Sequence, residues 1–255
     1  MVFPVIHSTL DPKALIKELE QRYDLQDNVR CQLISRANND FYEVISGKRR
    51  FALRVAKANF RTTEESLFEA EYVTHLKHAG CLVPAPIKTQ DGRYFFKVEA
   101  PEGLRTITLM DWLDGKPFGK GISPEEANHM GSALATLHDA GESFESQALR
   151  SIDTVKILRD RMPDLYLLLD HEPEHRLFYE RATATVETAF QQLDSTALRR
   201  GAVHGDFQFA NAMRTPNGSI AVIDFDTCGV GYCAEDLYTF IWRSDMEIRD
   251  TSVNQ

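Results

Sequence analysis

The stretch from residue 201 to residue 242 constrains the fold more strongly than any other part of the chain. It contains the run HGDFQFAN and then the pair Asn217-Gly218 between two segments that favour β-strands. An Asn-Gly pair in that setting is a strong signal for a hairpin. We therefore expect Asp206 and Asn211 on a loop before the hairpin, and Asp224 at the end of its second, very apolar strand.

Phosphoryl transfer requires residues of these types at this kind of spacing. One carboxylate accepts or orients the proton of the attacking hydroxyl, and hard oxygen ligands hold Mg²⁺ against the nucleotide phosphates. The protein-kinase catalytic loop has Asp two residues after His, and Asn five residues after that Asp. His204, Asp206 and Asn211 have the same spacing, and Asp224 follows on the predicted second strand, in front of Phe225. Short motifs recur by chance, so the interpretation depends on their conjunction.

The stretch resembles the aminoglycoside phosphotransferase and choline kinase superfamily, whose signature is His-Gly-Asp, four residues, Asn, and later a strand that ends in Asp. The resemblance implies a kinase-like fold that uses ATP and Mg²⁺ and phosphorylates a hydroxyl group of a small molecule. Acceptors in that superfamily include aminoglycosides, choline, ethanolamine, homoserine and sugars. Asp236 matches a structural position near the start of the following helix.

The same resemblance implies a role for each residue of the motif. Asp206 would be the catalytic base or positioning carboxylate, and Asn211 and Asp224 would ligate Mg²⁺. His204 would brace the loop rather than transfer protons. Asp226 takes the position of the glycine in the protein-kinase turn and would support the site, either by stabilising the turn or through the chemistry itself.

The N-terminal part of the chain supplies a candidate phosphate contact. In kinase-like folds a strand presents Ala-x-Lys, and the Lys pairs with a helix Glu and with the nucleotide phosphates. The run FALRV has Arg54 at the lysine position and Ala52 where it would lie against adenine. Arg keeps the charge and binds phosphate through two donors. We expect Glu71 as the helix partner, with Glu69 as the alternative and a plain structural ion pair also open; Lys57 is a weaker phosphate contact, because it should point to the opposite face.

Two further segments complete the predicted nucleotide site. The run ANND between the first two predicted strands has no glycine, so by the resemblance Asn38 and Asn39 would contact the phosphates through backbone amides and short side chains. A hinge would hydrogen-bond adenine through its backbone, and it comprises Leu109, Met110, Asp111 and Trp112.

The order of the predicted elements indicates an α+β protein. Asp can cap a helix and Pro is tolerated at its first position, so Asp11-Pro12 begins the first helix. Alternation of apolar residues and turn signals predict strands at 31–34, 41–45, 50–56, 87–89 with 94–98, and 106–112. Helical patterns and caps predict helices at 63–78, from the capping box at Ser123 to about 141, at 155–169 and at 174–193.

These elements suggest a bilobal, protein-kinase-like fold. Residues 1–108 form the N-terminal nucleotide-binding lobe, with a small antiparallel sheet and a helix. Residues 109–115 form the hinge, and residues 116–255 form a mostly helical C-terminal lobe with the catalytic and metal-binding loops.

Composition excludes several functional classes. A net charge of -9 and a pI near 5.4 argue against broad nucleic-acid binding, which needs a basic surface. No run approaches the roughly 18–20 apolar residues of a membrane span, and the start MVFPVIHSTL lacks the features of a signal peptide. We therefore expect a cytoplasmic protein without a membrane partner. The four cysteines match no common zinc pattern and are interpreted as reduced, with a single disulfide as the alternative.

Three functions fit this pattern, and a small-molecule kinase is the leading hypothesis. A bacterial protein serine/threonine kinase is the first alternative, although no Ala-Pro-Glu follows Asp224, as a eukaryotic-type activation segment requires. A non-catalytic nucleotide-binding pseudokinase is the second, favoured by Arg54 in place of lysine. We favour an enzyme because the residues for base and metal chemistry are all present.

The sequence does not specify the acceptor, the choice between ATP and GTP, or the oligomeric state. Residues 160–164 and 170–174 are acidic, which suits a cationic acceptor and suits a solvated surface equally well. The polar run 243–255 ends the chain where the resemblance implies further helices around the acceptor pocket. A truncated chain, an open pocket and a pocket completed by a partner subunit are the alternatives.

Overall fold

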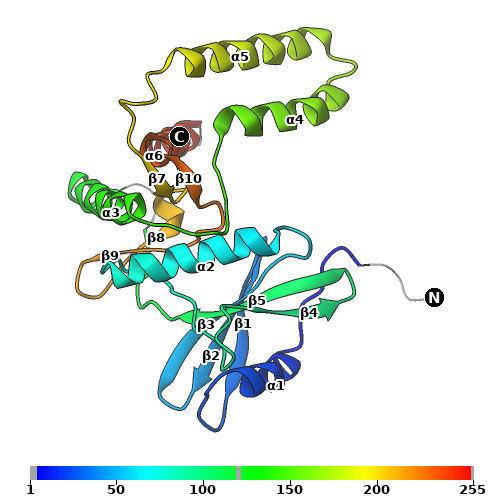
Figure 1. The fold of residues 1–255 in the computed structure, drawn as a ribbon, viewed down its shortest axis with the longest axis vertical. Helices are drawn as coiled ribbons and strands as arrows, with labels where there is room; N and C mark the ends of the chain where they lie inside the picture. The colour runs from blue at the N-terminus through cyan, green and yellow to red at the C-terminus, as the bar shows by residue number, and fades with distance from the viewer. Residues whose placement is uncertain (1–4, 119–121, 254–255) are drawn as a thin grey trace.

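The N-terminal lobe is built on a five-stranded antiparallel sheet (Figure 1). The computed structural model describes residues 5–118 and 122–253. In the order β1-β2-β3-β5-β4, the strands are β1 (Arg30–Arg36), β2 (Asp40–Ser46), β3 (Arg49–Val55), β5 (Gly103–Asp111) and β4 (Phe96–Ala100).

Strict alternation along β2 and β3 gives this sheet one buried face. Tyr42 and Val44 on β2 and Phe51, Leu53 and Val55 on β3 are buried together in one hydrophobic cluster. Successive side chains of a strand point to opposite faces, so the residues between them face outwards. That outward face of β3 is the one that carries Ala52 and Arg54.

Helix α1 (Pro12–Arg22) covers the buried face of the sheet. The carboxylate of Asp11 accepts the Lys13 N–H at 2.9 Å and caps the helix, as the sequence predicts. Leu15 and Leu19 lie one turn apart and are buried against the sheet. The lobe therefore has its own core, separate from the site on the other face.

Helix α2 (Thr63–His78) lies between the sheet and the C-terminal lobe (Figure 1). Thr62 and Glu65 form a reciprocal capping box that fixes its start. Its buried face, with Phe68, Tyr72 and Leu76, belongs to the same hydrophobic cluster as residues of the C-terminal lobe. The helix therefore joins the two lobes by burial of apolar surface.

The C-terminal lobe combines helices with two small sheets. Helix α3 (Pro124–Glu142) begins at the predicted capping box of Ser123 and Glu126. The sheets have the orders β10-β7 and β6-β8-β9. The remaining elements near the core are β6 (Lys116–Pro117), β7 (Arg200–Val203), the 3-10 turn η1 (Phe209–Asn211), β8 (Ala212–Arg214), β9 (Ile220–Val222), β10 (Gly229–Tyr232) and α6 (Cys233–Val253).

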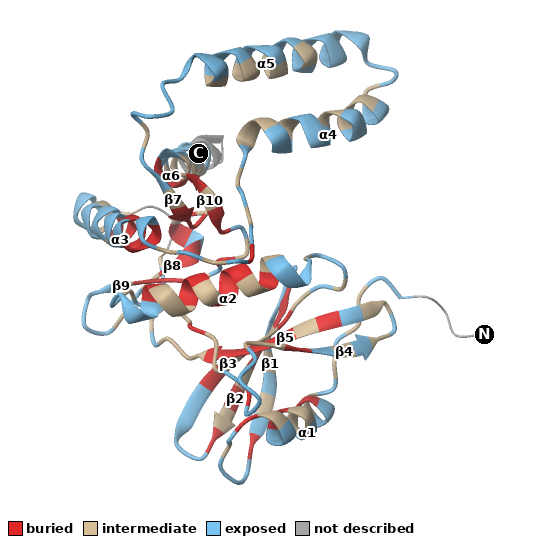
Figure 2. Ribbon diagram, viewed as in Figure 1, coloured by how far each residue is buried: buried red, intermediate tan, exposed pale blue. Residues whose placement is uncertain are grey.

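Helices α4 (Thr154–Leu168) and α5 (Pro173–Gln192) form an antiparallel pair that stands away from the rest of the lobe (Figure 2). Neither helix contains a buried residue. Within the described residues, no helix is long and apolar enough to cross a membrane. The four cysteines are free, in agreement with their interpretation as reduced thiols.

The predicted helices and the first three strands agree with the structure to within one or two residues at most ends. The predicted strand at 87–89 is wrong, because the chain there forms no strand and only the preceding Pro86 makes an isolated bridge, to Met110. The short strands β6, β7 and β10 were not predicted. They pair only with segments distant in sequence, so local patterns carry little signal for them.

The core between the lobes gives a first prediction. Leu76 is fully buried in the cluster that joins α2 to α3, so Leu76→Ala should lower the free energy of unfolding by about 2–5 kcal/mol through lost burial and a cavity. Leu104 is 52% exposed, and Leu104→Ala should change it by less than about 0.5 kcal/mol. Equal midpoints for the two variants in urea unfolding would contradict this role of α2.

Candidate active site

A buried carboxylate holds the loop that follows β7. Asp236, at the start of α6 and fully buried, accepts the backbone N–H groups of His204 at 2.9 Å and Gly205 at 2.6 Å. It also contacts Nε2 of the buried His138 at 3.0 Å. Gly205 has φ +80°, and a Cβ there would lie 2.3 Å from the carbonyl oxygen of Thr227. Only glycine fits this position, so the Gly of the motif has a steric reason.

His204 connects this loop to the strand before Asp224. Its Nε2 lies 3.0 Å from the carbonyl oxygen of Ile223, and its Nδ1 accepts the N–H of Asp206 at 3.2 Å. These contacts require the neutral tautomer with the proton on Nε2. The buried ring therefore has the geometry of a brace, which is the role that the sequence suggests.

Asp206 is oriented by two amide side chains. Gln208 Nε2 donates to its Oδ2 at 2.8 Å, and Asn211 Nδ2 donates to the same oxygen at 3.0 Å. Asn211 Nδ2 also lies 2.9 Å from the backbone oxygen of Asp206. Among the described residues both side-chain bonds go to Oδ2, so Oδ1 is the oxygen left for an acceptor hydroxyl. Gln208 was not singled out from the sequence, although it lies inside the motif.

Asp224 follows β9 in the left-handed region, with φ +63°. The preceding Ile223 donates its N–H to the carbonyl oxygen of Asn211 at 2.9 Å, so the two predicted metal ligands lie on adjoining segments. Burial raises the pKa of Asp224, and the negative charge of Asp226 raises it further, while Arg54 acts in the opposite direction. An uncompensated buried carboxylate of this kind is suited to a cation.

The donor set fits Mg²⁺ of the kinase type. Asn211 and Asp224 offer hard oxygen atoms, which Mg²⁺ prefers, and Mg²⁺ usually takes only one or two protein carboxylates together with substrate phosphates and water. The described residues contain no group of three or more His, Cys, Asp or Glu side chains that could hold a metal alone. The pair is therefore suited to a metal that arrives with a nucleotide.

A cavity of about 310 Å³ lies between the lobes. Ala52 and Met110 are paired across β3 and β5 at its sheet side. The remaining lining residues are contributed by the sheet, α2, the chain after β5 and the catalytic segment: Phe41, Arg54, Glu69, Val73, Pro84, Asp111, Trp112, Leu113, Ala210, Asn211, Met213, Ile223, Asp224 and Phe225. Candidate adenine, phosphate and metal contacts from both lobes thus share one cavity.

Four residues of the predicted nucleotide site do not line this cavity: Asn38, Asn39, Glu71 and Leu109. Leu109 is buried in the core of the N-terminal lobe, and its carbonyl oxygen already accepts the N–H of Ile87 at 2.8 Å. Asn38 is exposed in the turn before β2. Leu109 is therefore corrected from an adenine contact to a core residue, because the alternation of β5 turns it away. Asp111 donates its N–H to the carbonyl oxygen of Ala85 at 2.9 Å.

The predicted partner of Arg54 is wrong, and the alternative is right. Arg54 binds both carboxylate oxygens of Glu69, at 2.6 and 2.9 Å. Glu71 instead accepts a hydrogen bond from Ser146 at 2.5 Å. Residues two apart on a helix point in nearly opposite directions. Since Glu69 faces the sheet, Glu71 necessarily faces the C-terminal lobe.

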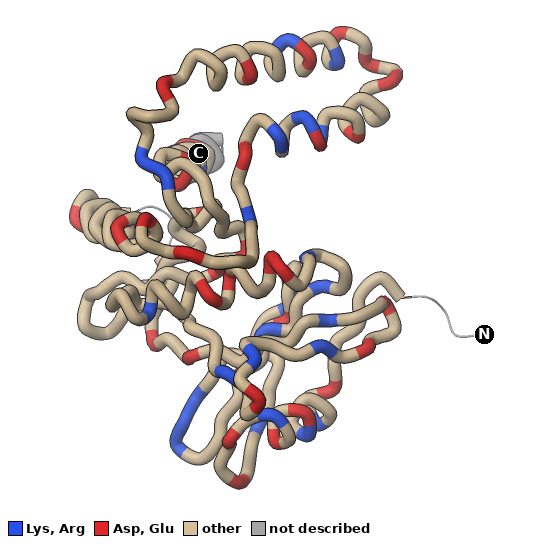
Figure 3. The backbone as a smooth tube through the Cα atoms, in the orientation of Figure 1, with Lys and Arg blue, Asp and Glu red and all other residues tan. Residues whose placement is uncertain are grey.

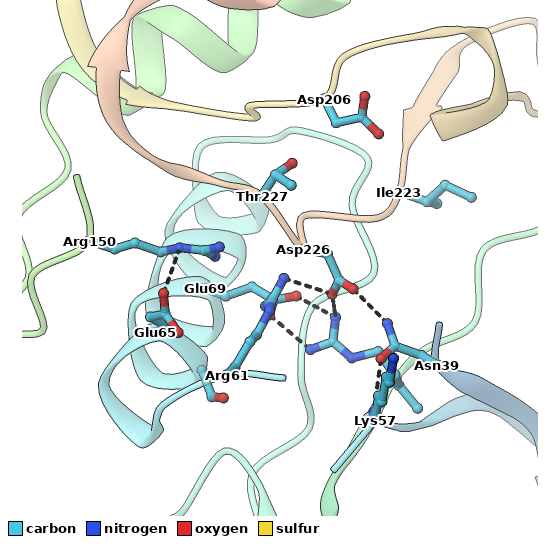
Figure 4. Close-up of polar contacts among 12 residues, drawn as sticks. Asn39, Lys57, Arg61, Glu65, Glu69, Arg150, Asp206, Ile223, Asp226 and Thr227 are labelled. Carbon is cyan, nitrogen blue, oxygen red and sulfur yellow. Dashed lines mark hydrogen bonds and ion pairs between the residues drawn. The ribbon is translucent and has the colours of Figure 1, made fainter. Parts of the chain in front are cut away.

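Asp226 is bound by three groups of the N-terminal lobe (Figure 4). Arg54 donates to its Oδ1 at 2.7 Å, Arg61 Nη2 lies 3.1 Å from the same oxygen, and Asn39 donates to its Oδ2 at 2.6 Å. Burial alone would raise the pKa of Asp226, but the two guanidinium groups and the Asn39 amide hold it below its usual value. Asp226 and Asn39 thus connect the lobes, and sequence analysis did not identify Arg61.

Comparison with known proteins decides the family. The family model described as "Phosphotransferase enzyme family" matches residues 30–255, which is most of the chain. The chain belongs to this family. The predicted resemblance is thereby confirmed, and so is the prediction of an ATP-dependent phosphotransferase at the level of the family.

The relatives of this phosphotransferase family member include two named kinases. The chain is 32% identical to an uncharacterized protein of Deinococcus radiodurans over 94% of its own length and 69% of that protein. It is 29% identical to homoserine kinase of Methylobacillus glycogenes over 80% of its length and 60% of that protein. It is 22% identical to amicoumacin kinase of Bacillus subtilis over 89% of its length and 68% of that protein. The chain thus spans about two thirds of these relatives.

Solved structures confirm the kinase-like fold. An amicoumacin kinase in complex with AMP-PNP and Ca²⁺ aligns with a TM-score of 0.70 at 17% identity, over 91% of this chain and 69% of that one. A spectinomycin phosphotransferase in complex with ADP aligns with a TM-score of 0.65 at 16% identity, over 95% and 78%. A microcompartment-associated aminopropanol kinase aligns with a TM-score of 0.61 at 20% identity, over 89% and 73%.

The opposite charge environments of Asp224 and Asp226 give a second prediction. The folded-state pKa of Asp224 is above its ordinary value of 3.8, so its ionised form costs stability at neutral pH. In metal-free buffer, Asp224→Asn should therefore raise the melting temperature at pH 7. The gain should shrink as the pH falls from the folded-state pKa towards 3.8, below which the carboxyl is protonated in both states.

Asp226→Asn serves as the matched control with the opposite sign. Its folded-state pKa is below 3.8, so Asp226 contributes stability above pH 3.8 that is lost as the pH falls through the folded value. The variant should melt at a lower temperature than wild type at pH 7. Thermal melting of both variants across pH checks the pair, and shifts of the same sign at pH 7 would contradict this electrostatic account.

The buried carboxylate of Asp236 gives a third prediction. Asp236→Ala should lower the free energy of unfolding by about 3 kcal/mol, because it leaves buried donors without an acceptor. Asp27 is exposed, and Asp27→Ala should change it by less than about 0.5 kcal/mol. Urea unfolding measures both, and a loss below 1 kcal/mol for Asp236→Ala would mean that the loop is held by other contacts.

Proposed function

We propose that this chain transfers the γ-phosphoryl group of ATP to a hydroxyl group of a small molecule, with Mg²⁺ bound by Asn211 and Asp224. The observation that carries the proposal is that Arg54, Asn211 and Asp224 all line one cavity between the lobes. Asp206 is fixed beside it through Asn211. Candidate groups for the phosphates, the metal and the attacking hydroxyl are thus adjacent.

The nucleotide would lie between β3 and the chain after β5. Ala52 and Met110 would contact adenine, and the carbonyl of Asp111 and the backbone of Trp112 would hydrogen-bond its edge. Arg54, oriented by Glu69, would bind the phosphates through its guanidinium group. When bound, Mg²⁺ supplies positive charge against the phosphate oxygens during transfer.

Asp206 would orient the attacking hydroxyl. Because Oδ2 is occupied by Gln208 and Asn211, the carboxylate is fixed and its other oxygen can accept the hydroxyl hydrogen. The acceptor oxygen forms a bond to the γ-phosphorus as the bond from that phosphorus to the ADP oxygen breaks, and the hydroxyl proton passes to Asp206. The products are ADP and a phosphate monoester.

Acceptors with both an amine and a hydroxyl group are the first class to test. Two of the similar proteins are an aminopropanol kinase and a homoserine kinase. Aminopropanol and homoserine each carry an amine and a hydroxyl group. Acidic residues occur on α4, on α5 and at the turn between them (Figure 3). Several of these are already paired, as Asp160 is with Lys156 and Glu172 with His175, so they support a cationic acceptor only weakly.

The fourth prediction concerns Asp206. Asp206→Asn should lower kcat by about 10²–10⁴-fold with an amino alcohol, sugar or aminoglycoside that wild type phosphorylates, because it removes the proton acceptor, while ATP affinity stays within about threefold. Asp27→Asn, on the exposed surface, should keep wild-type kcat. ADP release with each acceptor, compared with ADP release without one, measures the effect.

The same assay separates the alternatives. Full activity of Asp206→Asn would exclude its proposed role. Wild-type phosphorylation of a generic protein substrate, with no small-molecule turnover, would favour a protein serine/threonine kinase. Stabilisation of the wild type by Mg²⁺ and ATP without turnover of any acceptor would favour a pseudokinase. The presence of Asp206, Asn211 and Asp224 around one cavity favours the enzyme.

A further inference from the structure

Arg61 is a buried cation whose hydrogen bonds are incomplete. Its side chain is only 7% exposed, and Nη1 donates to Oε2 of Glu69 at 2.5 Å. Nη2 lies 3.1 Å from Oδ1 of Asp226, but neither Nη2 nor Nε has a hydrogen-bond partner among the described residues. Buried donors without partners are rare and costly, so such a group in a native protein requires an explanation.

The surroundings of Arg61 point to an anion as the missing partner. Arg54 and Arg61 share the two carboxylates Glu69 and Asp226, and Glu69 and Arg54 line the interlobe cavity. Asp226 comes from the other lobe (Figure 4), two residues after the predicted metal ligand Asp224. Its carboxylate bridges the guanidinium groups of Arg54, which lines the cavity, and Arg61, which lies behind it. A phosphate group carries the same charge and the same kind of oxygen atoms.

A triphosphate needs more positive charge and more donors than Arg54 alone offers. Both terminal nitrogens of Arg54 are already bound to Glu69. The turn before β2 has no glycine, and the side chain of Asn39 is bound to Asp226, so this turn is not arranged as a cradle of free donors. Within this cluster, Arg61 has the unsatisfied donors that a phosphate would fill.

We propose that Arg61 is a second phosphate-binding residue of the nucleotide site. In the structure Arg61 faces Asp226, and on binding of a nucleoside triphosphate the phosphates would replace the carboxylate of Asp226 at Arg61 and Arg54. The exchange substitutes one anion for another, so neither guanidinium group is left without a counter-charge. This inference rests on the proposed function, since it concerns the same nucleotide site.

The test compares nucleotides that differ only in their phosphates. Dissociation constants for ATP and AMP in Mg²⁺ buffer are measured by calorimetry for wild type, Arg61→Gln, Arg61→Lys and Arg93→Gln. Arg61→Gln should weaken ATP binding about 10- to 100-fold and change AMP binding by less than about threefold. Arg61→Lys keeps the positive charge and the pairing with Glu69, so its affinity for ATP should lie between those of wild type and Arg61→Gln. Arg93 is 76% exposed, and Arg93→Gln should bind both nucleotides like wild type.

The outcomes separate this inference from the proposed function. If wild type binds ATP and the ratio of ATP to AMP affinity is the same in Arg61→Gln and Arg61→Lys, Arg61 has only a structural role and the inference fails alone. If wild type does not bind ATP, the proposed function fails with it. If Arg61→Gln does not fold, Arg61→Lys decides, because an unchanged ATP to AMP ratio in that variant overturns the inference.

Discussion

The contact between the lobes around Asp226 is the interaction on which the site depends. One carboxylate of the C-terminal lobe holds Arg54, Arg61 and Asn39, which come from three separate segments of the N-terminal lobe. Buried charges are tolerated only when paired, and Glu69 balances the second positive charge. The position of Arg54 over the cavity therefore depends on both lobes at once.

A second buried carboxylate organises the catalytic loop in the same way. Asp236 holds His204 and Gly205, and His204 in turn contacts the residue before Asp224. The loop with Asp206 and the strand end with Asp224 are thus fixed to each other through one imidazole ring. Such pre-organisation matters because phosphoryl transfer depends mainly on positioning and electrostatics.

Much of this could be predicted from the sequence, where local rules apply. The caps at Asp11 and Ser123, the alternation in β3 and the Asn217-Gly218 hairpin all act within a few residues, and the structure agrees with each. The kinase-like fold was implied by the resemblance of the segment from His204 to Asp224 to the aminoglycoside phosphotransferase and choline kinase superfamily. Glu69 was named only as the alternative, because choosing between two acidic residues requires the rotation of α2 about its axis.

The features that the sequence did not predict arise from long-range pairing. Arg61 lies in a polar segment before a helix cap, where an exposed cation is the ordinary expectation, and only the approach of Asp226 buries it. Leu109 belongs to the core because of its register on β5. A hinge predicted from the sequence does not specify which residues of that strand face the core. The strands β7 and β10 pair with each other, although the catalytic loop and the β8–β9 hairpin separate them in the sequence.

The central claim is that one interlobe cavity binds ATP and its metal for phosphoryl transfer. A crystal structure of the protein with Mg²⁺ and AMP-PNP tests it most directly. The account predicts adenine against Ala52 and Met110, the phosphates at Arg54, and the metal bound by Asn211 and Asp224. A nucleotide bound elsewhere, or a metal that contacts neither of these two residues, would contradict it.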